Sequence, residues 1–382
     1  MSGGLRTFSL VAPWRQPVTV PRGDPRDRGG PAQPLLLVEN LRKHFRIAGG
    51  VFNRKVGAVK AVDDISFAVM KGETLGVVGE SGCGKSTLAR LLVGLIAADA
   101  GSVVLDGDPV GGSHGIGLRE LRRNVQIVFQ DSDASLNPRL PIEETIAYGP
   151  RVHGMARAAA KQLAHDLLRR VGLRPDLFAA RYPHEISGGQ KQRVNIARAL
   201  ALSPRLLILD EAVSALDKSV EAQVLNLLRY LKTHFNLTYI FISHDLNVVQ
   251  YIADRVMVMY LGQVVEIGPA DAIYHNPKHP YTRALLDSRL AVDPLDRIET
   301  PPLTGDPPNP IAPPSGCRFR TRCDFAEEVC ATKQPLIADA SLTPSHHHAA
   351  CHMTQRGSGH SRAGDAPPRS ILALANVAAR PA

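Results

Sequence analysis

The sequence has 382 residues, of which 44% are hydrophobic and 21% charged, an ordinary balance for a globular protein. No apolar run approaches the roughly 18 residues that a membrane-spanning helix needs, so we expect that the chain itself does not cross a bilayer. Of the formal net charge of +9, a net of +3 lies in residues 1–34 and another +3 in residues 356–382, so the charge gives only weak support to nucleic-acid binding. The length allows an α/β domain of about 250 residues and a smaller unit.

The first elements are predicted from composition and β-branched content. Residues 1–34 are rich in Pro, Gly and Arg and bury too little apolar surface to offset the entropy of ordering, which predicts a disordered arm. Order is expected to begin at Leu35–Val38, and Ala58–Phe67 is typical of a strand. We expect a loop between them, at Gly49–Gly57.

The stretch Gly79–Thr87 reads GESGCGKST and matches the phosphate-binding pattern G-x-x-x-x-G-K-S/T. A run suited to a buried strand precedes it and a helical pattern follows it, which is the context that the motif requires. Backbone N–H groups and the helix dipole would surround phosphate oxygens there, with Lys85 reaching the β- and γ-phosphates and Ser86 binding Mg²⁺. The other positions expected at the nucleotide are Gly79, Ser81, Gly82, Cys83, Gly84 and Thr87. A glycine-rich turn with a solvated lysine is the disfavoured alternative.

An aromatic side chain shortly before the phosphate loop could stack on the nucleotide base. Phe45 is the first candidate for this role and Phe52 is the second. A core or hydrophobic-staple role for Phe45 is the alternative, and the sequence leaves it open.

Polar residues follow the ends of three further predicted strands, where ligands bind in open α/β sheets. One run ends at Gln130, a second at Asp210 and Glu211, and a third at His244. Each residue taken singly is more often structural, but together with Lys85 they fit phosphoryl transfer to water. Asp210 would hold Mg²⁺, Glu211 would orient or deprotonate the attacking water, and His244 would contact the γ-phosphate. Gln130 would complete the metal and water shell.

Two helices are predicted beyond the phosphate loop. Ala158–Val171 has apolar residues at helical spacing, typical of a surface helix. The segment ISGGQ, residues 186–190, precedes a second helical pattern at Lys191–Leu202, and Ser187 is suited to cap it. From spacing alone, a capped helix start and an anion site are equally good interpretations.

These residues resemble the ATP-binding cassette (ABC) ATPases over about residues 35–270. ISGGQ is similar to the family's LSGGQ signature, RLLILDE to Walker B, Ser214–Asp217 to the D-loop and His244 to the switch histidine. Departures are small, since Ile186 replaces Leu and Asn195 is polar where the family usually has a small residue. The resemblance implies an α/β P-loop NTPase fold of ABC type, with a mixed sheet core, a helical signature subdomain and an N-terminal antiparallel β part.

The resemblance also implies a head-to-tail dimer in which the signature of one subunit caps the γ-phosphate bound at Lys85 of the other. Closure on two ATP molecules and opening after hydrolysis would drive a partner through Gln130 and the loop after it. The signature and D-loop residues carried over to the nucleotide site are Ser187, Gly188, Gly189, Gln190 and Asp217.

A Pro-rich linker, Pro301–Pro314, precedes four cysteines with the spacing C-x5-C-x6-C-x20-C. No secretory signal is evident, so we expect a reducing cytosol in which clustered thiols can chelate a metal. Thiolates suit iron–sulfur clusters or zinc, nearby histidines keep zinc open, and four independent buried cysteines are the remaining alternative. The cysteines are Cys317, Cys323, Cys330 and Cys351, and the histidines are His346, His347, His348 and His352.

The segment HPYT at His279–Thr282, the segment SLNPR after Gln130 and the cysteine tail resemble the peptide-importer branch of the cassette family. Some ATPase subunits of that branch carry a [4Fe-4S] cluster on matching cysteines, which the resemblance implies here as a hypothesis. It implies an ATPase at the cytoplasmic face of the bacterial inner membrane that energises import of dipeptides or oligopeptides. Its partners would be two transmembrane permease subunits, a second ABC ATPase, identical or paralogous, and indirectly a periplasmic binding protein.

Other functions stay open at this point. A soluble ABC ATPase acting on nucleic acid or ribosomes would use the positive tails, but no specific nucleic acid is expected because the chain carries one cassette without long insertions. An importer of nickel or another small solute, or an exporter, also fits the motifs. The predicted boundaries are an arm at 1–34, the cassette at 35–270, an oligopeptide-transporter-type region at 271–355 and a tail at 356–382. The tail contains the apolar run Ile371–Leu374, expected as a short helix or disordered.

Overall fold

The computed structural model describes residues 33–49, 54–112, 115–288, 305–337 and 346–364 together with Asp27 and Gly30. Most of the predicted arm, Phe52 and the apolar run at 371–374 lie outside these residues. Among the helices that the structure describes, none has the length and apolar character needed to cross a bilayer.

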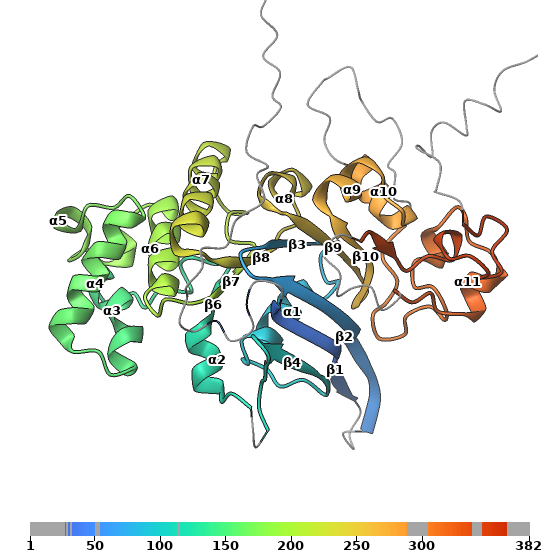
Figure 1. The fold of residues 1–382 in the computed structure, drawn as a ribbon, viewed down its shortest axis with the longest axis horizontal. Helices are drawn as coiled ribbons and strands as arrows, with labels where there is room; N and C mark the ends of the chain where they lie inside the picture. Colours follow the sequence, from blue (N-terminus) through green and yellow to red (C-terminus); the bar gives the residue numbers. More distant parts are fainter. Residues whose placement is uncertain are drawn as a thin grey trace, which may run out of the picture.

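A seven-stranded sheet forms the core, in the order β11-β10-β9-β3-β8-β7-β6 (Figure 1). The strands from β6 to β9 pair in parallel, whereas β10 and β11 add antiparallel pairs at one edge. Strands β3, β7, β8 and β9 are buried along their whole length, as parallel strands covered on both faces should be. The bounds are β3 Thr74–Val78, β6 Val125–Val128, β7 Leu206–Asp210, β8 Thr238–Ile242, β9 Arg255–Tyr260, β10 Gln263–Pro269 and β11 His348–Ala349.

Alternate residues of the central strands enter two separate cores. In β7, Leu206 and Ile208 belong to one cluster, while Leu207 and Leu209 belong to the other. Figure 1 shows α1 on one side of the sheet and α7 and α8 on the other. These and the remaining helices against the sheet are α1 Lys85–Leu92, α2 Leu118–Asn124, α7 Lys218–Phe235, α8 Leu246–Ile252, α9 Ala270–His275 and α10 Pro280–Asp287.

A smaller antiparallel sheet, in the order β2-β1-β4-β5, is the predicted N-terminal β part. Its strands are β1 Pro34–Gly49, β2 Arg54–Met70, β4 Ala100–Leu105 and β5 Asp108–Pro109. The prediction of a loop at 49–57 is wrong for the last residues of this range, which belong to β2. Gly57 pairs with Ile47 within the β1–β2 hairpin. Cross-strand hydrogen bonds outweigh the local glycine preference there. The side chain of Ile311 covers this point, and a Cβ at Gly57 would lie 2.8 Å from its Cγ2.

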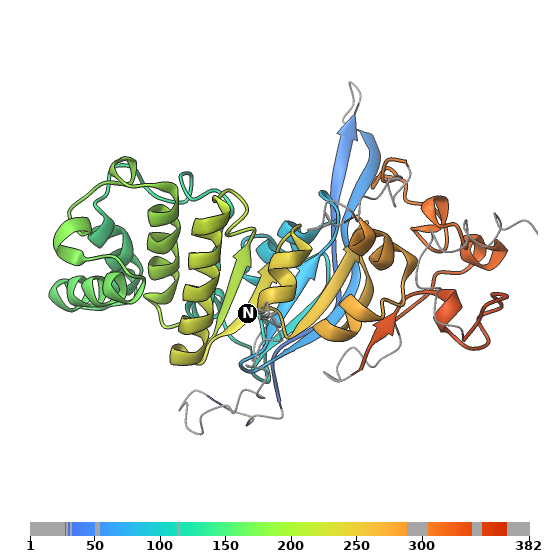
Figure 2. The ribbon, with the colours of Figure 1, turned by 90° about the horizontal axis from the view of Figure 1, so that it is seen from above.

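The helical subdomain lies at one end of the molecule (Figures 1 and 2). Its helices are α3 Ile142–Val152, α4 Arg157–Arg170, α5 Pro175–Phe178 and α6 Gly188–Leu200, with a 3-10 turn, η1, at Pro183–Glu185. The predicted surface helix is α4, which buries Ala160, Ala164 and Leu168 at helical spacing. The helix predicted from Lys191 is α6, which begins three residues earlier because Ser187 caps it.

The C-terminal region lies at the opposite end and is joined to the core sheet, since Ala349 of β11 pairs with Glu266 of β10 (Figure 2). Its short elements are η2 Arg320–Arg322, α11 Glu328–Thr332 and η4 His352–Thr354. Residues that were assigned to the tail continue this region as far as Gly364. The Gly364 N–H donates to the Met353 carbonyl at 2.7 Å, and His360 is buried.

Candidate nucleotide-binding and hydrolysis site

The predicted phosphate loop lies between β3 and α1, so the strand, loop and helix expected around the motif are all present. The Lys85 ammonium is buried and donates to the carbonyls of Gly79 at 2.7 Å and Glu80 at 3.0 Å, which closes the loop. Gly84 has φ 110°, and a Cβ on it would lie 2.0 Å from the Ala61 carbonyl oxygen. Only glycine fits this approach to β2.

Two oxygen ligands of the kind that Mg²⁺ prefers lie side by side at the end of β7. The Ser86 hydroxyl, in the first turn of α1, donates to Oδ1 of Asp210 at 3.0 Å. Burial raises the pKa of Asp210 and the nearby Glu211 raises it further, against the effect of the Ser86 hydrogen bond. A bound cation would offset both unfavourable effects. Hydroxyl and carboxylate oxygens, with water in the other positions, suit Mg²⁺.

Glu211 and His244 meet at the ends of neighbouring strands β7 and β8. Glu211 has φ 50°, an unusual value for a residue with a side chain, and its N–H donates to the Ile242 carbonyl at 3.0 Å. His244 Nδ1 lies 3.3 Å from Glu211 Oε2, and the His244 side chain is 60% exposed. The geometry brings together a carboxylate able to accept a proton from water and an imidazole open to a ligand.

Gln130 lies two residues after β6, the strand that neighbours β7, and its side chain is exposed. The loop after it is held by α6. Asn195 donates to the Ser132 carbonyl at 3.3 Å, Lys191 pairs with Asp133, and Arg198 donates to the Ser135 carbonyl. Asn195 therefore joins the signature helix to this loop.

The signature residues do not join Lys85 in this chain. Helix α6 contacts β6 at the sheet edge, whereas the phosphate loop follows β3, with β7 and β8 in between. Ser187 and Gln190 form a capping box, in which the Ser187 N–H donates to Gln190 Oε1 at 2.9 Å. Ser187, Gly188 and Asp217 are exposed. The capped helix start is present, and its outer face is open to a partner.

Phe45 lies on β1, opposite Val59, with its side chain 42% exposed. This exposure excludes the core alternative. The Lys43 ammonium lies 5.7 Å from the ring centroid. An exposed ring with a cation beside it is suited to stack on a base.

The four C-terminal cysteines line one small cavity of about 20 Å³ and are free thiols. Burial, with a smaller contribution from neighbouring thiols of the set, raises the pKa of Cys317 to about 11 and those of Cys323 and Cys351 to about 12. The cysteines are therefore gathered and not independent. Within the described ranges, no group of three or more His, Cys, Asp or Glu side chains is placed to hold a single metal ion.

The histidines near these cysteines have other contacts. The His347 ring lies 2.6 Å from Glu266, and the His352 ring lies 2.9 Å from the Lys333 carbonyl. One phosphate-loop contact that the motif does not predict is made by the Tyr281 hydroxyl, which accepts the Glu80 N–H at 2.8 Å. Tyr281 belongs to the HPYT segment, which the sequence marked only by its resemblance.

Comparison with protein families matches residues 62–214 to a family described as "ABC transporter" and residues 265–330 to "Oligopeptide/dipeptide transporter, C-terminal region". The oligopeptide transport ATP-binding protein AppF of Bacillus subtilis is 48% identical over 325 residues, covering 84% of this chain and 98% of that protein. OppF of Escherichia coli, with the same description, is 49% identical over 309 residues, covering 79% and 92%. This chain belongs to the ABC transporter ATP-binding proteins.

Solved structures agree with this membership. The ABC protein cbiO1 of Clostridium perfringens, part of the complex cbiONQ, superposes with a TM-score of 0.54 at 27% identity, covering 63% of this chain and 90% of its own. A dimeric ATP-binding cassette bound to ADP and Pi after hydrolysis also superposes with a TM-score of 0.54, at 26% identity, covering 62% and 98%. The predicted ABC-type P-loop NTPase fold is confirmed, and the chain is an ABC ATPase.

Proposed function

We propose that this chain is the ATP-hydrolysing subunit that energises import of dipeptides or oligopeptides across the bacterial inner membrane. The observation that carries the proposal is the extent of the similarity. Proteins described as oligopeptide transport ATP-binding proteins are 48% and 49% identical over 84% and 79% of this chain, and the C-terminal region has its own family match. Nickel or another solute, and action on nucleic acid, are not favoured by these relatives.

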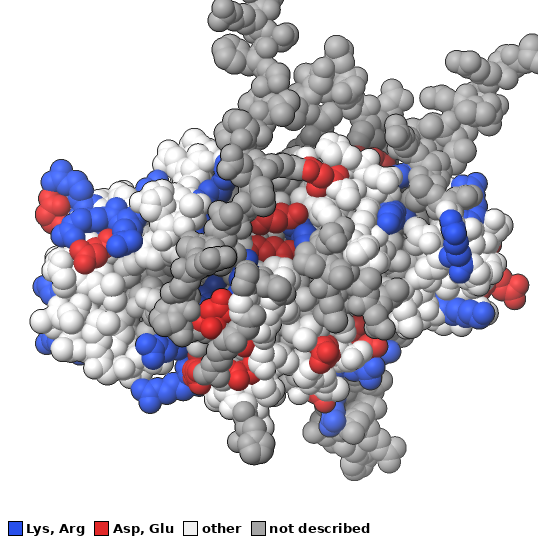
Figure 3. Space-filling model, in the orientation of Figure 1, with Lys and Arg blue, Asp and Glu red and all other residues white. Residues whose placement is uncertain are grey.

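The surface gives the nucleic-acid alternative no further support. Figure 3 shows Lys and Arg side chains scattered among Asp and Glu over the described part of one face. Strong nucleic-acid binding usually needs a continuous basic surface, which this part of the face lacks.

The hydrolysis mechanism follows from the side chains at the strand ends. Lys85 would exchange its loop carbonyls for β- and γ-phosphate oxygens, and Ser86 and Asp210 would hold Mg²⁺, with Gln130 completing the shell. Bound Mg²⁺ would offset the charge of the phosphates. Glu211 would orient the attacking water and accept its proton, and His244 would contact the γ-phosphate beside it. The remaining loop positions would contact phosphates through backbone N–H groups, and Phe45 would stack on the base.

A second ATPase subunit would complete the site. The signature and D-loop residues would face the γ-phosphate bound at Lys85 of an identical or paralogous partner. They are Ser187, Gly188, Gly189, Gln190 and Asp217. The exposure of Ser187, Gly188 and Asp217 and the distance of the signature along the sheet from Lys85 support this arrangement, as does the dimeric structure of a related cassette. Closure on ATP would move α6 and, through Asn195, the loop after Gln130.

That loop would contact membrane partners. We place the chain at the cytoplasmic face of the inner membrane, bound to two transmembrane permease subunits and served by a periplasmic binding protein. The support is membership of a transporter family. Affinity purification from mildly solubilised native membranes tests the assignment. Two multispanning proteins and a second cassette ATPase should co-purify, whereas recovery with ribosomes or DNA would overturn it.

We also propose that Cys317, Cys323, Cys330 and Cys351 hold a [4Fe-4S] cluster. Four soft donors around one cavity fit such a cluster, whose positive charge would stabilise thiolates that burial otherwise disfavours. Protein purified without oxygen should be brown, with broad absorption near ~400 nm. A colourless preparation, with zinc or without metal, would contradict the proposal.

A further inference from the structure

The segment that links the first two cysteines also contacts the nucleotide core. It runs from Cys317 to Cys323, and its arginines Arg318 and Arg322 have mostly buried side chains that leave the cysteine region. The Arg320 guanidinium, between them in the same segment, donates to Ser315 within the region. This short segment therefore supplies two arginines that contact the core. It also supplies a third arginine, Arg320, whose hydrogen bonds stay within the C-terminal region and which can serve as a matched control.

Arg322 binds the second residue of the phosphate loop with two parallel hydrogen bonds. Its guanidinium donates to Glu80 Oε2 at 2.8 Å and to Oε1 at 3.0 Å, with only 5% of the arginine side chain exposed. These bonds to Glu80 raise the pKa of Arg322, so the guanidinium is firmly charged. The same Glu80 donates its N–H to Tyr281, and its carbonyl accepts from Lys85. Arg322 thus fixes a residue that directly contacts the phosphate-binding lysine.

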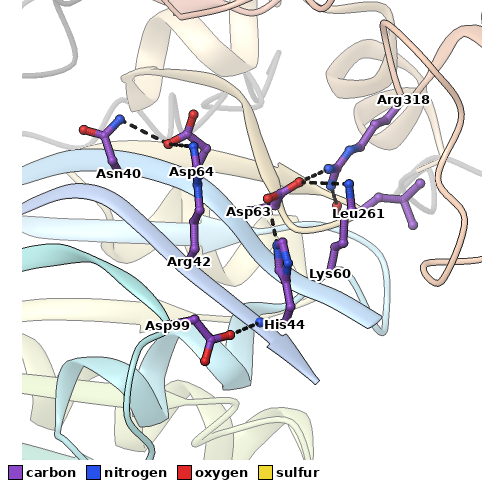
Figure 4. A network of polar contacts seen from close by, with 9 residues as sticks. All are labelled: Asn40, Arg42, His44, Lys60, Asp63, Asp64, Asp99, Leu261 and Arg318. Carbon is purple, nitrogen blue, oxygen red and sulfur yellow. Dashed lines mark hydrogen bonds and ion pairs between the residues drawn. The ribbon is translucent and has the colours of Figure 1, made fainter. Parts of the chain in front are cut away.

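Arg318 contacts the other side of the nucleotide core (Figure 4). Its guanidinium donates to the Leu261 carbonyl and to Asp63, and Asp63 lies 2.8 Å from the His44 ring, next in sequence to Phe45. The residue after Leu261, Gly262, donates its N–H to the Cys83 carbonyl of the phosphate loop at 2.9 Å. The cysteine region therefore holds the loop from two directions.

Charge explains why the Arg322 contact matters for ATP. Glu80 places a partly buried carboxylate in the loop that is to receive the triphosphate, where like charges repel strongly because little water screens them. Arg322 neutralises that carboxylate and turns it toward the cysteine region. Without Arg322, the carboxylate is left uncompensated and Glu80 loses the two bonds that hold its side chain, while the Tyr281 and Lys85 contacts to its backbone remain.

We propose that Arg322 is a positioning residue for ATP, through which the cysteine region sets the nucleotide affinity of its own chain. This inference rests on the proposed assignment of residues 79–87 as the phosphate loop. Arg322 itself is not among the residues used to assign the function.

The test measures the Kd of ATP with Mg²⁺ for the full chain by isothermal titration calorimetry. Arg322→Ala should raise the Kd roughly five- to tenfold, as expected for loss of a charged, paired hydrogen bond. Arg322→Lys, which keeps the charge, should raise it less, and Arg320→Ala should leave it unchanged. The kcat at saturating ATP should change less than the KM. Equal Kd values for Arg322→Ala and Arg320→Ala would overturn the proposal.

Glu80→Gln provides the second arm. In the Arg322→Ala background it removes the uncompensated charge, so the double variant should bind ATP more tightly than Arg322→Ala alone. No difference between these two would contradict the charge argument. Thermal unfolding without nucleotide identifies any variant that fails to fold. If Arg322→Ala is such a variant, the Kd of Arg322→Lys is compared with that of Arg320→Ala instead. Lys85→Ala distinguishes a failure of the Arg322 proposal from a failure of the phosphate-loop assignment. If this variant binds ATP like the wild type, the phosphate-loop assignment itself is wrong.

Discussion

The nucleotide core and the C-terminal region bring distant residues of the sequence together in different ways. In the core, Asp210, Glu211 and His244 lie at the ends of adjacent parallel strands, so the sheet itself brings them together. Where the structure describes the C-terminal region beyond residue 305, its helices are short and its strand has two residues, and side chains such as Arg322 and Phe319 attach it to the core. Regular structure therefore makes a site recognisable by motifs, whereas an attached region acts through individual contacts.

The largest effect is expected in the core, from Glu211→Gln. This change removes the group that we propose accepts a proton from water, so ATP turnover should fall about 10²- to 10⁴-fold while the Lys85 contacts remain. ATP-bound dimers should accumulate, which size-exclusion chromatography with ATP would detect beside an ATPase assay. Rapid turnover by this variant would remove Glu211 from its assigned role.

The attachment of the C-terminal region should depend on Phe319. Its ring is 2% exposed and lies 5.4 Å from Tyr260, 5.3 Å from Tyr281 and 5.8 Å from His279, measured between ring centroids. Phe319→Ala should lower the free energy of unfolding by about 3–5 kcal/mol in urea titrations, because it leaves a cavity between core and region. Phe325→Ala, at a half-buried position within the region, is the matched control. Equal losses would show that Phe319 has no special part in the attachment.

A smaller effect concerns pH. Burial lowers the pKa of His279 to about 4, although the Glu266 carboxylate raises it, so the folded chain keeps this imidazole neutral. Between the unfolded value near 6.5 and pH 4 the unfolded state binds more protons, and stability falls by at most about 3 kcal/mol as pH drops through that window. His279→Gln removes the titration. The free energy of unfolding, measured in urea at pH values from 7 to 4.5, should fall less with decreasing pH in the variant than in the wild type. Parallel dependences in the two proteins would exclude this role of His279.

The sequence could predict the core site because each motif lies at the end of a strand with clear apolar character. The phosphate loop, the cap at Ser187 and the strand ending at Asp210 follow from local residue patterns. Other features depend on distant partners. Gly57 extends a strand because β1 pairs with it. Glu80 and Arg322 are 242 residues apart, and neither lies in a pattern that points to the other.

The same reasoning explains the C-terminal region. Four clustered cysteines indicated a common site, and the structure gathers them around one cavity. The pairing of β11 with β10 and the continuation to Gly364 could not be predicted, because a two-residue strand and a segment rich in small polar residues have no periodic pattern.

Peptide uptake into proteoliposomes tests the central claim most directly. Vesicles would contain the complex purified with this chain, ATP inside, and the binding protein with a labelled oligopeptide outside. We predict uptake that depends on ATP and is lost with Glu211→Gln in this chain and its partner ATPase. Uptake equal to wild type with that variant, or ATP hydrolysis that no peptide stimulates, would contradict the account.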